Sequence, residues 1–212
     1  MKLLKNISIG FIISFLGSLP LSYLNIVGVE ILSELGFYEL ISYLFGIIIV
    51  QTVVVYVTVA FANQLIDNKK LMKAIDFLAI VFLLVLAYLF YAYSGQTFKE
   101  RDYLKHYVQY SPIVIGMVLC ALNFLQIPFW IGWNLYLMNA KYIFLKPKLK
   151  HFYVLGTALG TFFGILLAVE TLESLSHQSF SFSKYIMPIG IPLFFIVLAI
   201  FQTFKVYKKH IR

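Results

Sequence analysis

The chain has 212 residues, of which 61% are apolar and only 12% are charged. Soluble globular domains average roughly 45–50% apolar and about 25% charged residues, so a water-soluble domain is excluded. The aromatic content of 18% excludes a disordered chain. A single cysteine, Cys120, excludes an intrachain disulfide and a cysteine-based metal site. The composition therefore predicts an integral membrane protein, with the lipid bilayer as its main partner.

Six runs without Asp, Glu, Lys or Arg are long enough to cross a membrane. They contain 24, 27, 22, 35, 19 and 20 residues in chain order, and a membrane-spanning helix needs about 20. The runs are apolar on all faces, which disfavours the alternating pattern of a β-barrel. The expected fold is therefore all-α and polytopic, with a single transmembrane domain over residues 1–212. Its six predicted helices lie near residues 7–29, 37–62, 75–94, 112–138, 151–170 and 185–205.

Basic residues are unevenly divided between the predicted loops. With six helices, 13 of the 17 Lys and Arg residues fall on the side of the N-terminus and four fall on the other side. Basic loops stay in the cytoplasm, so we expect a multi-pass protein of the cell (inner) membrane with both termini cytoplasmic. The net charge of +8 then reflects loops that face anionic lipid headgroups, and no nucleic-acid partner is expected.

The two halves of the sequence resemble each other. Residues 10–20 and 116–128 share a glycine, two leucines, a small residue and a following proline in the same order. A second match joins the Tyr-x-x-Gly sequences at 43–46 and 153–156, with the offset changed from 106 to 110 residues. With six helices the matched helices run in opposite directions. The sequence therefore predicts two inverted three-helix repeats, over residues 7–94 and 112–205, an architecture of secondary transporters.

Pro20 and Pro128 each lie near the middle of a predicted span. A proline inside a helix removes a backbone donor and kinks or breaks the helix, here freeing the carbonyls of Leu16 and Phe124. Interrupted helices at corresponding places in two halves indicate a transport site. A simple kink at each proline is the alternative.

Polar residues cluster beside these prolines, where amides are costly in lipid and are expected to face the bundle interior. Carboxamides of Asn25 and Asn123 at one depth could bind a zwitterion, donating to its carboxylate and accepting from its ammonium group. Alternatively, both asparagines only form hydrogen bonds that hold helices together. Asn134, which also lies near Pro128, is expected at the membrane interface. Trp130 could belong to an aromatic belt at that interface instead of stacking on a substrate cation. The predicted substrate-binding residues are Pro20, Asn25, Gln51, Asn123, Gln126, Pro128 and Trp130.

Small residues at four-residue spacing predict faces for close helix packing. They are Ser14 and Ser18 in the first span and Gly156, Gly160 and Gly164 in the fifth. We expect these residues to contact a neighbouring helix and not a substrate.

Catalytic signals are absent from the sequence. It has no metal-ligand spacing, nucleophile elbow or glycine-rich phosphate loop, and no ionisable Asp, Glu, Lys, Arg or His in the middle third of any span. We expect Glu30, Asp76 and Glu170 to be interfacial caps. Neither an enzyme nor a cofactor is predicted. Two classes of protein remain: a small-solute transporter that works by alternating access, and a non-transporting membrane scaffold with the same fold. In either class the protein could form a homo-oligomer.

Three segments resemble the LysE-type translocators (LysE/RhtB-like amino-acid exporters). Residues 10–25 are similar to the first helix of that family, and residues 156–164 to its fifth. Residues 121–133 are similar to its fourth helix, in the form found in Bacteroidetes members. The resemblance covers about residues 8–170. It implies six helices, two inverted repeats and export of amino acids or similar small solutes coupled to a cation, with functional residues Pro20, Asn25, Asn123 and Pro128.

The first helix departs from the family signature. Residues 20–22 read Pro-Leu-Ser, whereas the family has Pro-Pro-Gly or Pro-Gly-Pro, and Phe124 stands where many members have a second proline. These departures predict less sharply broken helices than in the family.

Overall fold

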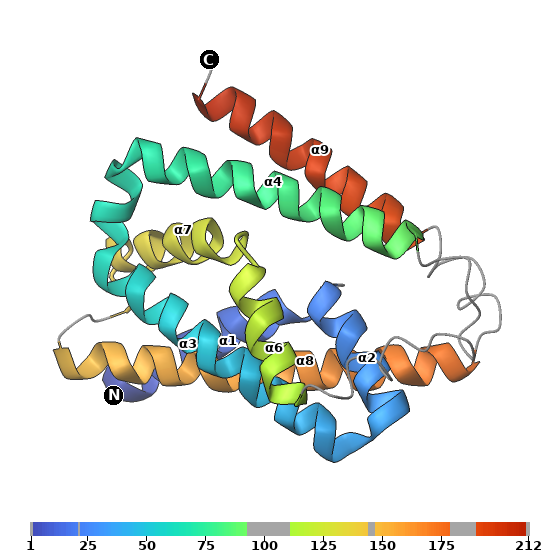
Figure 1. The fold of residues 1–212 in the computed structure, drawn as a ribbon. Helices are drawn as coiled ribbons and strands as arrows, with labels where there is room; N and C mark the ends of the chain where they lie inside the picture. The colour runs from blue at the N-terminus through green and yellow to red at the C-terminus, as the bar shows by residue number, and fades with distance from the viewer. Residues whose placement is uncertain (1, 21, 93–110, 144–146, 179–189, 211–212) are drawn as a thin grey trace.

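The computed structural model describes residues 2–20, 22–92, 111–143, 147–178 and 190–210 (Figure 1). Over these ranges the regular elements are all helices and no strand occurs, which confirms the all-α class. The predicted spans extend beyond these ranges at residues 93–94 and 185–189, and Lys99, Arg101, Lys105, Lys146 and Lys184 also lie outside the described residues. The helices are α1 (Lys2–Ser18), α2 (Tyr23–Leu35), α3 (Phe37–Asp67), α4 (Lys69–Ala92), α6 (Pro112–Leu122), α7 (Gln126–Asn139), α8 (Pro147–Gln178) and α9 (Ile191–His210).

Two described helices are long and apolar enough to cross a membrane, over Phe37–Phe61 in α3 and Leu149–Ser174 in α8. The number rises to four if each of two bent helix pairs is counted as one span. The pair α1 and α2 is bent by 78°, and the pair α6 and α7 by 69°. The longest apolar helical stretch of α4 that the structure describes, Asp76–Val85, is shorter than a span.

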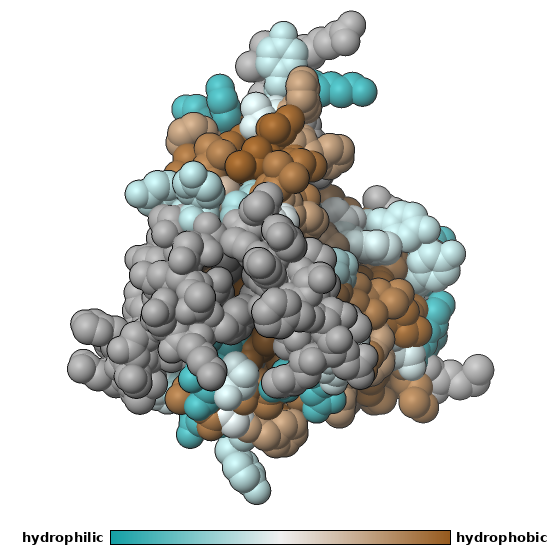
Figure 2. Space-filling view, turned by 90° about the vertical axis from the view of Figure 1, so that its right-hand side faces the viewer, coloured by the Kyte–Doolittle hydropathy of each residue, from teal (hydrophilic) through white to brown (hydrophobic). Residues whose placement is uncertain are grey.

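Large apolar side chains cover the outside of the bundle. Phe77 on α4 and Phe201 and Phe204 on α9 are each more than half exposed. Figure 2 looks along the bundle from the right-hand side of Figure 1 and shows apolar surface on its flanks. Soluble proteins rarely expose large contiguous apolar patches, so these faces are suited to contact with lipid.

The first helix break contains Pro20, as predicted. α1 ends at Ser18, and Ser22 caps the N-terminus of α2 by accepting a hydrogen bond from the Asn25 backbone nitrogen (3.3 Å). The two helices are bent by 78° at this break, so the chain is sharply broken here although residues 20–22 depart from the family signature. The missing second proline and glycine are not needed, because a serine cap starts a new helix in a new direction without them.

The second break lies earlier in the sequence than predicted. α6 ends at Leu122, and Pro128 is the third residue of α7. The first four N–H groups of a helix have no intrahelical partner, so Pro128 costs α7 no hydrogen bond and does not interrupt it. The Phe124 carbonyl, predicted to be freed by this proline, accepts from the Ile127 nitrogen (3.3 Å).

Glycines allow distant helices to pack backbone to backbone. α1 packs along α8, and α3 packs against α6. A Cβ added at Gly156 would overlap the Ile7 carbonyl, and one at Gly160 would overlap that of Phe11. At Gly164 an added Cβ would lie 2.8 Å from the Ser18 Cβ. The glycine face of α8 is therefore covered by α1 along three turns.

Successive long helices alternate in direction. The N-terminus, the junction of α3 with α4, the start of α8 and the end of α9 lie toward the left of Figure 1. The junction of α2 with α3 and the end of α8 lie at the right, and α4 and α9 run side by side at the top. Both ends of the described chain therefore lie toward one end of the bundle.

We expect Gly160→Ala to lower the thermal unfolding midpoint in detergent, because α1 must move away from α8 to admit the methyl group; such overpacking costs about 1–3 kcal/mol. Gly132→Ala on α7 is the matched control, since a Cβ there meets nothing within 4 Å. This control should be neutral or stabilising, because alanine favours helix more than glycine does. Equal changes of the two midpoints would contradict the packing argument.

Candidate functional site

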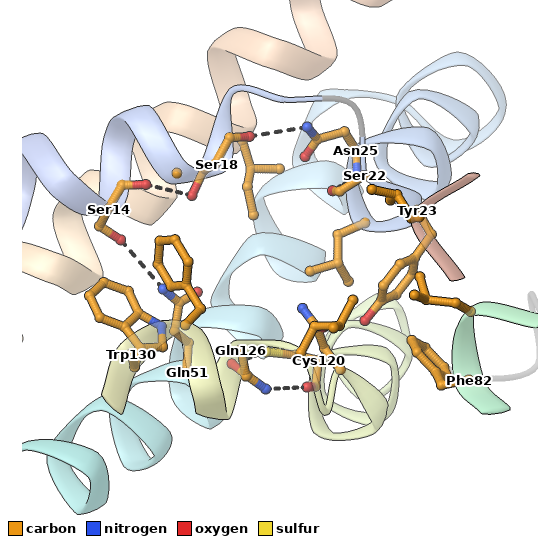
Figure 3. Close-up of a pocket in the computed structure, with 18 of the residues that line it drawn as sticks. Ser14, Ser18, Ser22, Tyr23, Asn25, Gln51, Phe82, Cys120, Gln126 and Trp130 are labelled. Atoms are coloured by element: carbon orange, nitrogen blue, oxygen red, sulfur yellow. Dashed lines mark hydrogen bonds between the residues drawn. The ribbon is translucent and has the colours of Figure 1, made fainter. Parts of the chain in front are cut away.

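A cavity of about 250 Å³ is lined by residues of both helix breaks (Figure 3). All eight described helices or their break residues contribute to its wall. Pro20 and Pro128 are not part of the lining, whereas Ser14 and Ser18, predicted as packing residues, are. Of the seven predicted substrate-binding residues, five line the cavity: Asn25, Gln51, Asn123, Gln126 and Trp130.

Asn25 closes the first break with one side of its carboxamide. The residue is fully buried, and Nδ2 donates to the carbonyl of Ser18 (3.1 Å) and to that of Pro20 (2.9 Å). These carbonyls lie where α1 ends and intrahelical partners run out. On its other side Oδ1 is buried without a hydrogen-bond partner. The amide thus holds the break together and also presents an unpaired acceptor.

Gln126 has a comparable part in the second break. Its Nε2 donates to the Cys120 carbonyl (2.7 Å), and its Oε1 lies 3.8 Å from Cys120 Sγ, which donates to it. Asn123 follows α6, and its backbone nitrogen donates to the same carbonyl (3.1 Å). The Asn123 side chain is half-buried and makes no hydrogen bond within the described residues. Of the cavity amides, it is the one with both its donors and its acceptor uncommitted.

Gln51 joins three helices at the edge of the cavity. Its Nε2 donates to Thr161 Oγ1 (2.6 Å) and to Ser14 Oγ (3.4 Å), and these two hydroxyl oxygens are 2.5 Å apart. The cluster ties α3 to α8 and α1. Thr161 was not predicted, because a threonine in an apolar helix usually bonds its own backbone, as Thr161 also does to Thr157 (3.0 Å).

Trp130 lies inside the fold and not in an interface belt. It is 3% exposed, lines the cavity and meets the Phe129 ring edge to face, with centroids 5.3 Å apart. Trp133 is 38% exposed on the outside of the same helix. Of the two tryptophans, only Trp130 can offer a ring to a ligand in the cavity.

Two polar residues that were expected at the membrane interface are buried inside the protein. Asn134, predicted at an interface, is fully buried; it donates to Thr58 Oγ1 (3.1 Å) and accepts from the Tyr153 hydroxyl (2.8 Å). It therefore ties α7 to α3 and α8. Asp76, predicted to be an interfacial cap, is only 3% exposed in α4.

The cavity offers hydrogen bonds and ring faces and no formal charge. None of the residues described in its wall is Asp, Glu, His, Lys or Arg. The described ranges also contain no group of three His, Cys, Asp or Glu side chains that could hold a metal ion. The described wall therefore surrounds the cavity with amide, hydroxyl, thiol and indole groups.

No protein-family model, curated protein or solved structure matches the chain.

We expect Thr161→Val to lower the thermal unfolding midpoint, because Ser14 and Gln51 lose their shared partner; leaving buried polar groups unpaired costs about 1–3 kcal/mol. Thr171→Val is the matched control on the same helix, where the hydroxyl is exposed and bonds only the Leu167 carbonyl. Its midpoint should change little. A control that falls as far as Thr161→Val would show that the cluster adds no stability.

Proposed function

We propose that this protein is a six-span membrane transporter that carries a small polar solute through the cavity between its two broken helices. The observation that carries the proposal is the position of the cavity, which has both helix breaks in its wall. Interrupted helices release backbone groups beside a site and line it in many secondary transporters. The amide, hydroxyl and indole groups found here fit such a site.

Matched contacts support the proposal of two inverted repeats. Gly10 of α1 lies against the Tyr153 backbone of α8, and Gly116 of α6 lies against the Tyr43 backbone of α3. These two contacts correspond under the offsets of 106 and 110 residues that align the halves of the sequence. The same backbone contact thus occurs twice at corresponding positions, which supports an inverted repeat.

A third correspondence supports a pseudo-twofold axis beside the cavity. The offset of 110 residues relates Gln51 to Thr161, and their side chains are 2.6 Å apart. Equivalent residues that touch each other must lie at the axis that relates them. Since Gln51 also lines the cavity, a solute there would sit between the repeats, where rocking of one repeat against the other changes access.

The two half-helices that leave the breaks are packed differently, which supports a cavity that is reached from the cytoplasm. α2, on the predicted external side, packs against α3, α6 and α8. α7, on the predicted cytoplasmic side, packs mainly against α3, touches α4 and meets α8 through the hydrogen bond between Asn134 and Tyr153. Repeats in unlike conformations close a central site on one side and open it on the other. An exporter loads its substrate in such a state.

The size and chemistry of the cavity favour an amino acid or a solute of similar size. The volume of about 250 Å³ is below the roughly 300–1,000 Å³ of drug-sized ligand sites. Asn123 supplies two donors and an acceptor, and Trp130 supplies a ring face for a cation. The carboxylate of a zwitterion could accept from the Asn123 amide while its ammonium group lies over the Trp130 ring, so no charged protein group is needed. This class of solute is also the one that the resemblance to LysE-type translocators implies.

A non-transporting scaffold is the second candidate. Asn25 and Gln126 commit their amide nitrogens to backbone carbonyls, which favours a structural part for these two residues. Efflux of a panel of radiolabelled amino acids from proteoliposomes separates the candidates. A scaffold would release none of them faster than protein-free liposomes do.

We expect Asn123→Ala to weaken efflux without unfolding the protein, because its side chain makes no hydrogen bond within the described fold. Loss of one hydrogen bond of about 1 kcal/mol should raise the half-saturating substrate concentration about fivefold. The control is Val118→Ala, on the outward face of α6 and half exposed, with efflux as in the wild type. Unchanged efflux by Asn123→Ala would remove this residue from the site.

We expect both termini to be cytoplasmic, which can be measured by cysteine labelling in intact cells after Cys120→Ala. Tyr38→Cys, at an 87% exposed position near the start of α3, should react with an impermeant maleimide from outside. Lys70→Cys, at an exposed position in the first turn of α4, should react only after the cells are opened. The reverse pattern would invert the proposed topology.

A further inference from the structure

We propose that the solute is an amino acid with an aliphatic side chain, and that Phe82 of α4 contacts this side chain. The inference deepens the proposed transport function and rests on it, because it names the solute class of the same cavity. The starting observation is a division of the described cavity wall. Hydrogen-bonding side chains reach the cavity from the broken helix pairs α1–α2 and α6–α7 and from α3, whereas α4, α8 and α9 contribute only apolar side chains.

The apolar part of the wall is built by three helices. Its members are Phe82 and Leu83 of α4, Ile165 of α8, and Phe195 and Leu198 of α9. Leu83, Ile165 and Phe195 are almost completely buried, and the other two are half-buried. All five belong to one hydrophobic cluster, in which α4 packs along α9. A ligand group that reaches this part of the wall meets carbon atoms and no hydrogen-bonding side chain.

Phe82 connects the apolar wall to the second helix break. Its ring contacts the Phe124 ring edge to face, with centroids 6.4 Å apart, and Phe124 directly follows Asn123 in the chain. The Tyr23 ring also meets Phe82 edge to face, with centroids 5.2 Å apart. In Figure 3, Phe82 and Tyr23 lie at the opposite end of the cavity from Trp130. Beyond a head group bound by Asn123 and Trp130, the side chain of the solute therefore has the Phe82 end of the cavity to occupy.

Most polar groups of the wall are already committed to the protein. The side-chain nitrogens of Asn25, Gln51 and Gln126 donate to carbonyl or hydroxyl oxygens, and the Ser18 hydroxyl donates to the Ser14 carbonyl (2.8 Å). The Asn123 amide makes no hydrogen bond within the described residues. One uncommitted amide can serve a head group, but it cannot also pair a polar side chain. A polar side chain of the solute would therefore lose its hydration without replacement.

Charged side chains of the solute are disfavoured more strongly. The described wall contains no Asp, Glu, His, Lys or Arg, so a second ammonium or carboxylate group would be buried without a counter-charge. An aliphatic side chain has the opposite preference, because each methylene group that leaves water for an apolar pocket adds affinity. The described wall therefore favours leucine or methionine over lysine, glutamate and alanine.

The solute class can be tested on the purified full-length protein in detergent. Binding of radiolabelled leucine is measured, with unlabelled amino acids as competitors, and the same panel is used for efflux from proteoliposomes. We expect methionine to displace the label, and alanine to do so with an affinity at least about tenfold below that of leucine. Lysine and glutamate should not displace it, and the order of efflux rates should follow the order of affinities.

Phe82→Ala tests the contact with the side chain of the solute. The affinity for leucine should fall several-fold, because the ring that its side chain touches is gone. The affinity for alanine should stay unchanged, because a single methyl group does not reach the ring. Phe77→Ala is the matched control on the same helix, since Phe77 is 63% exposed and lies outside the cavity lining. Both affinities of this control should equal those of the wild type.

Leu198→Glu tests the role of the missing counter-charge. Leu198 is half-buried in the apolar wall, and a carboxylate there gives the ammonium group of a lysine side chain a partner. We expect lysine to displace the label from this variant, and leucine to bind more weakly than to the wild type. Leu198→Gln is the control of equal size and zero charge, and lysine should not displace the label from it.

The outcomes separate the solute class from the transport function. Lysine or glutamate bound and exported in preference to leucine would overturn the aliphatic class and leave the transport proposal standing. The same ratio of leucine to alanine affinity in Phe82→Ala as in the wild type would overturn the assigned contact. Leucine binding that responds to Phe82→Ala, in a protein that moves no solute, would support the site and overturn the transport proposal. Neither binding nor efflux of any amino acid in the panel would overturn both.

Discussion

Every backbone group that a helix break releases inside a membrane must find its partner within the protein, because lipid offers none. This constraint explains the neighbourhood of both breaks. Asn25 donates to the carbonyls of Ser18 and Pro20, and Gln126 donates to the carbonyl of Cys120. The same amides that permit the breaks then form the wall of the cavity. Asn25 and Gln126 therefore have both a structural role and a candidate functional role, whereas the Asn123 side chain makes no hydrogen bond within the described residues.

Backbone-to-backbone helix contacts support the breaks from outside. Gly160 and its neighbours on α8 hold α1 close along three turns, and Gly116 lets α6 approach Tyr43 of α3. In a membrane such contacts depend on dispersion and close approach, since apolar burial between helices adds little over lipid. Two closely packed helix pairs result, and the half-helices α2 and α7 are packed unequally beside them.

Local sequence signals predicted some parts of the site and missed others for a physical reason. The first break was predicted because Pro20 and the capping Ser22 lie within it. The second was placed too late, because a proline fits the first turn of a helix as well as it breaks the middle of one. The hydrogen-bond partners of Asn134 were not predicted, since they come from α3 and α8. A polar residue in an apolar helix indicates that a hydrogen-bond partner is needed, but it does not indicate which helix supplies that partner.

The sequence by itself determined the helical class, the apolar character of the helices and the candidate amides, because these depend on composition, periodicity and spacing along the chain. Only the tertiary structure decided that five of the seven candidates share one cavity, that Gln51 meets Thr161, and that Asn25 Oδ1 is left unpaired. Those facts join residues up to 110 positions apart. They depend on how α1 packs on α8 and α3 on α6. Small residues at four-residue spacing mark a packing face on a helix, but they do not identify the helix that covers it.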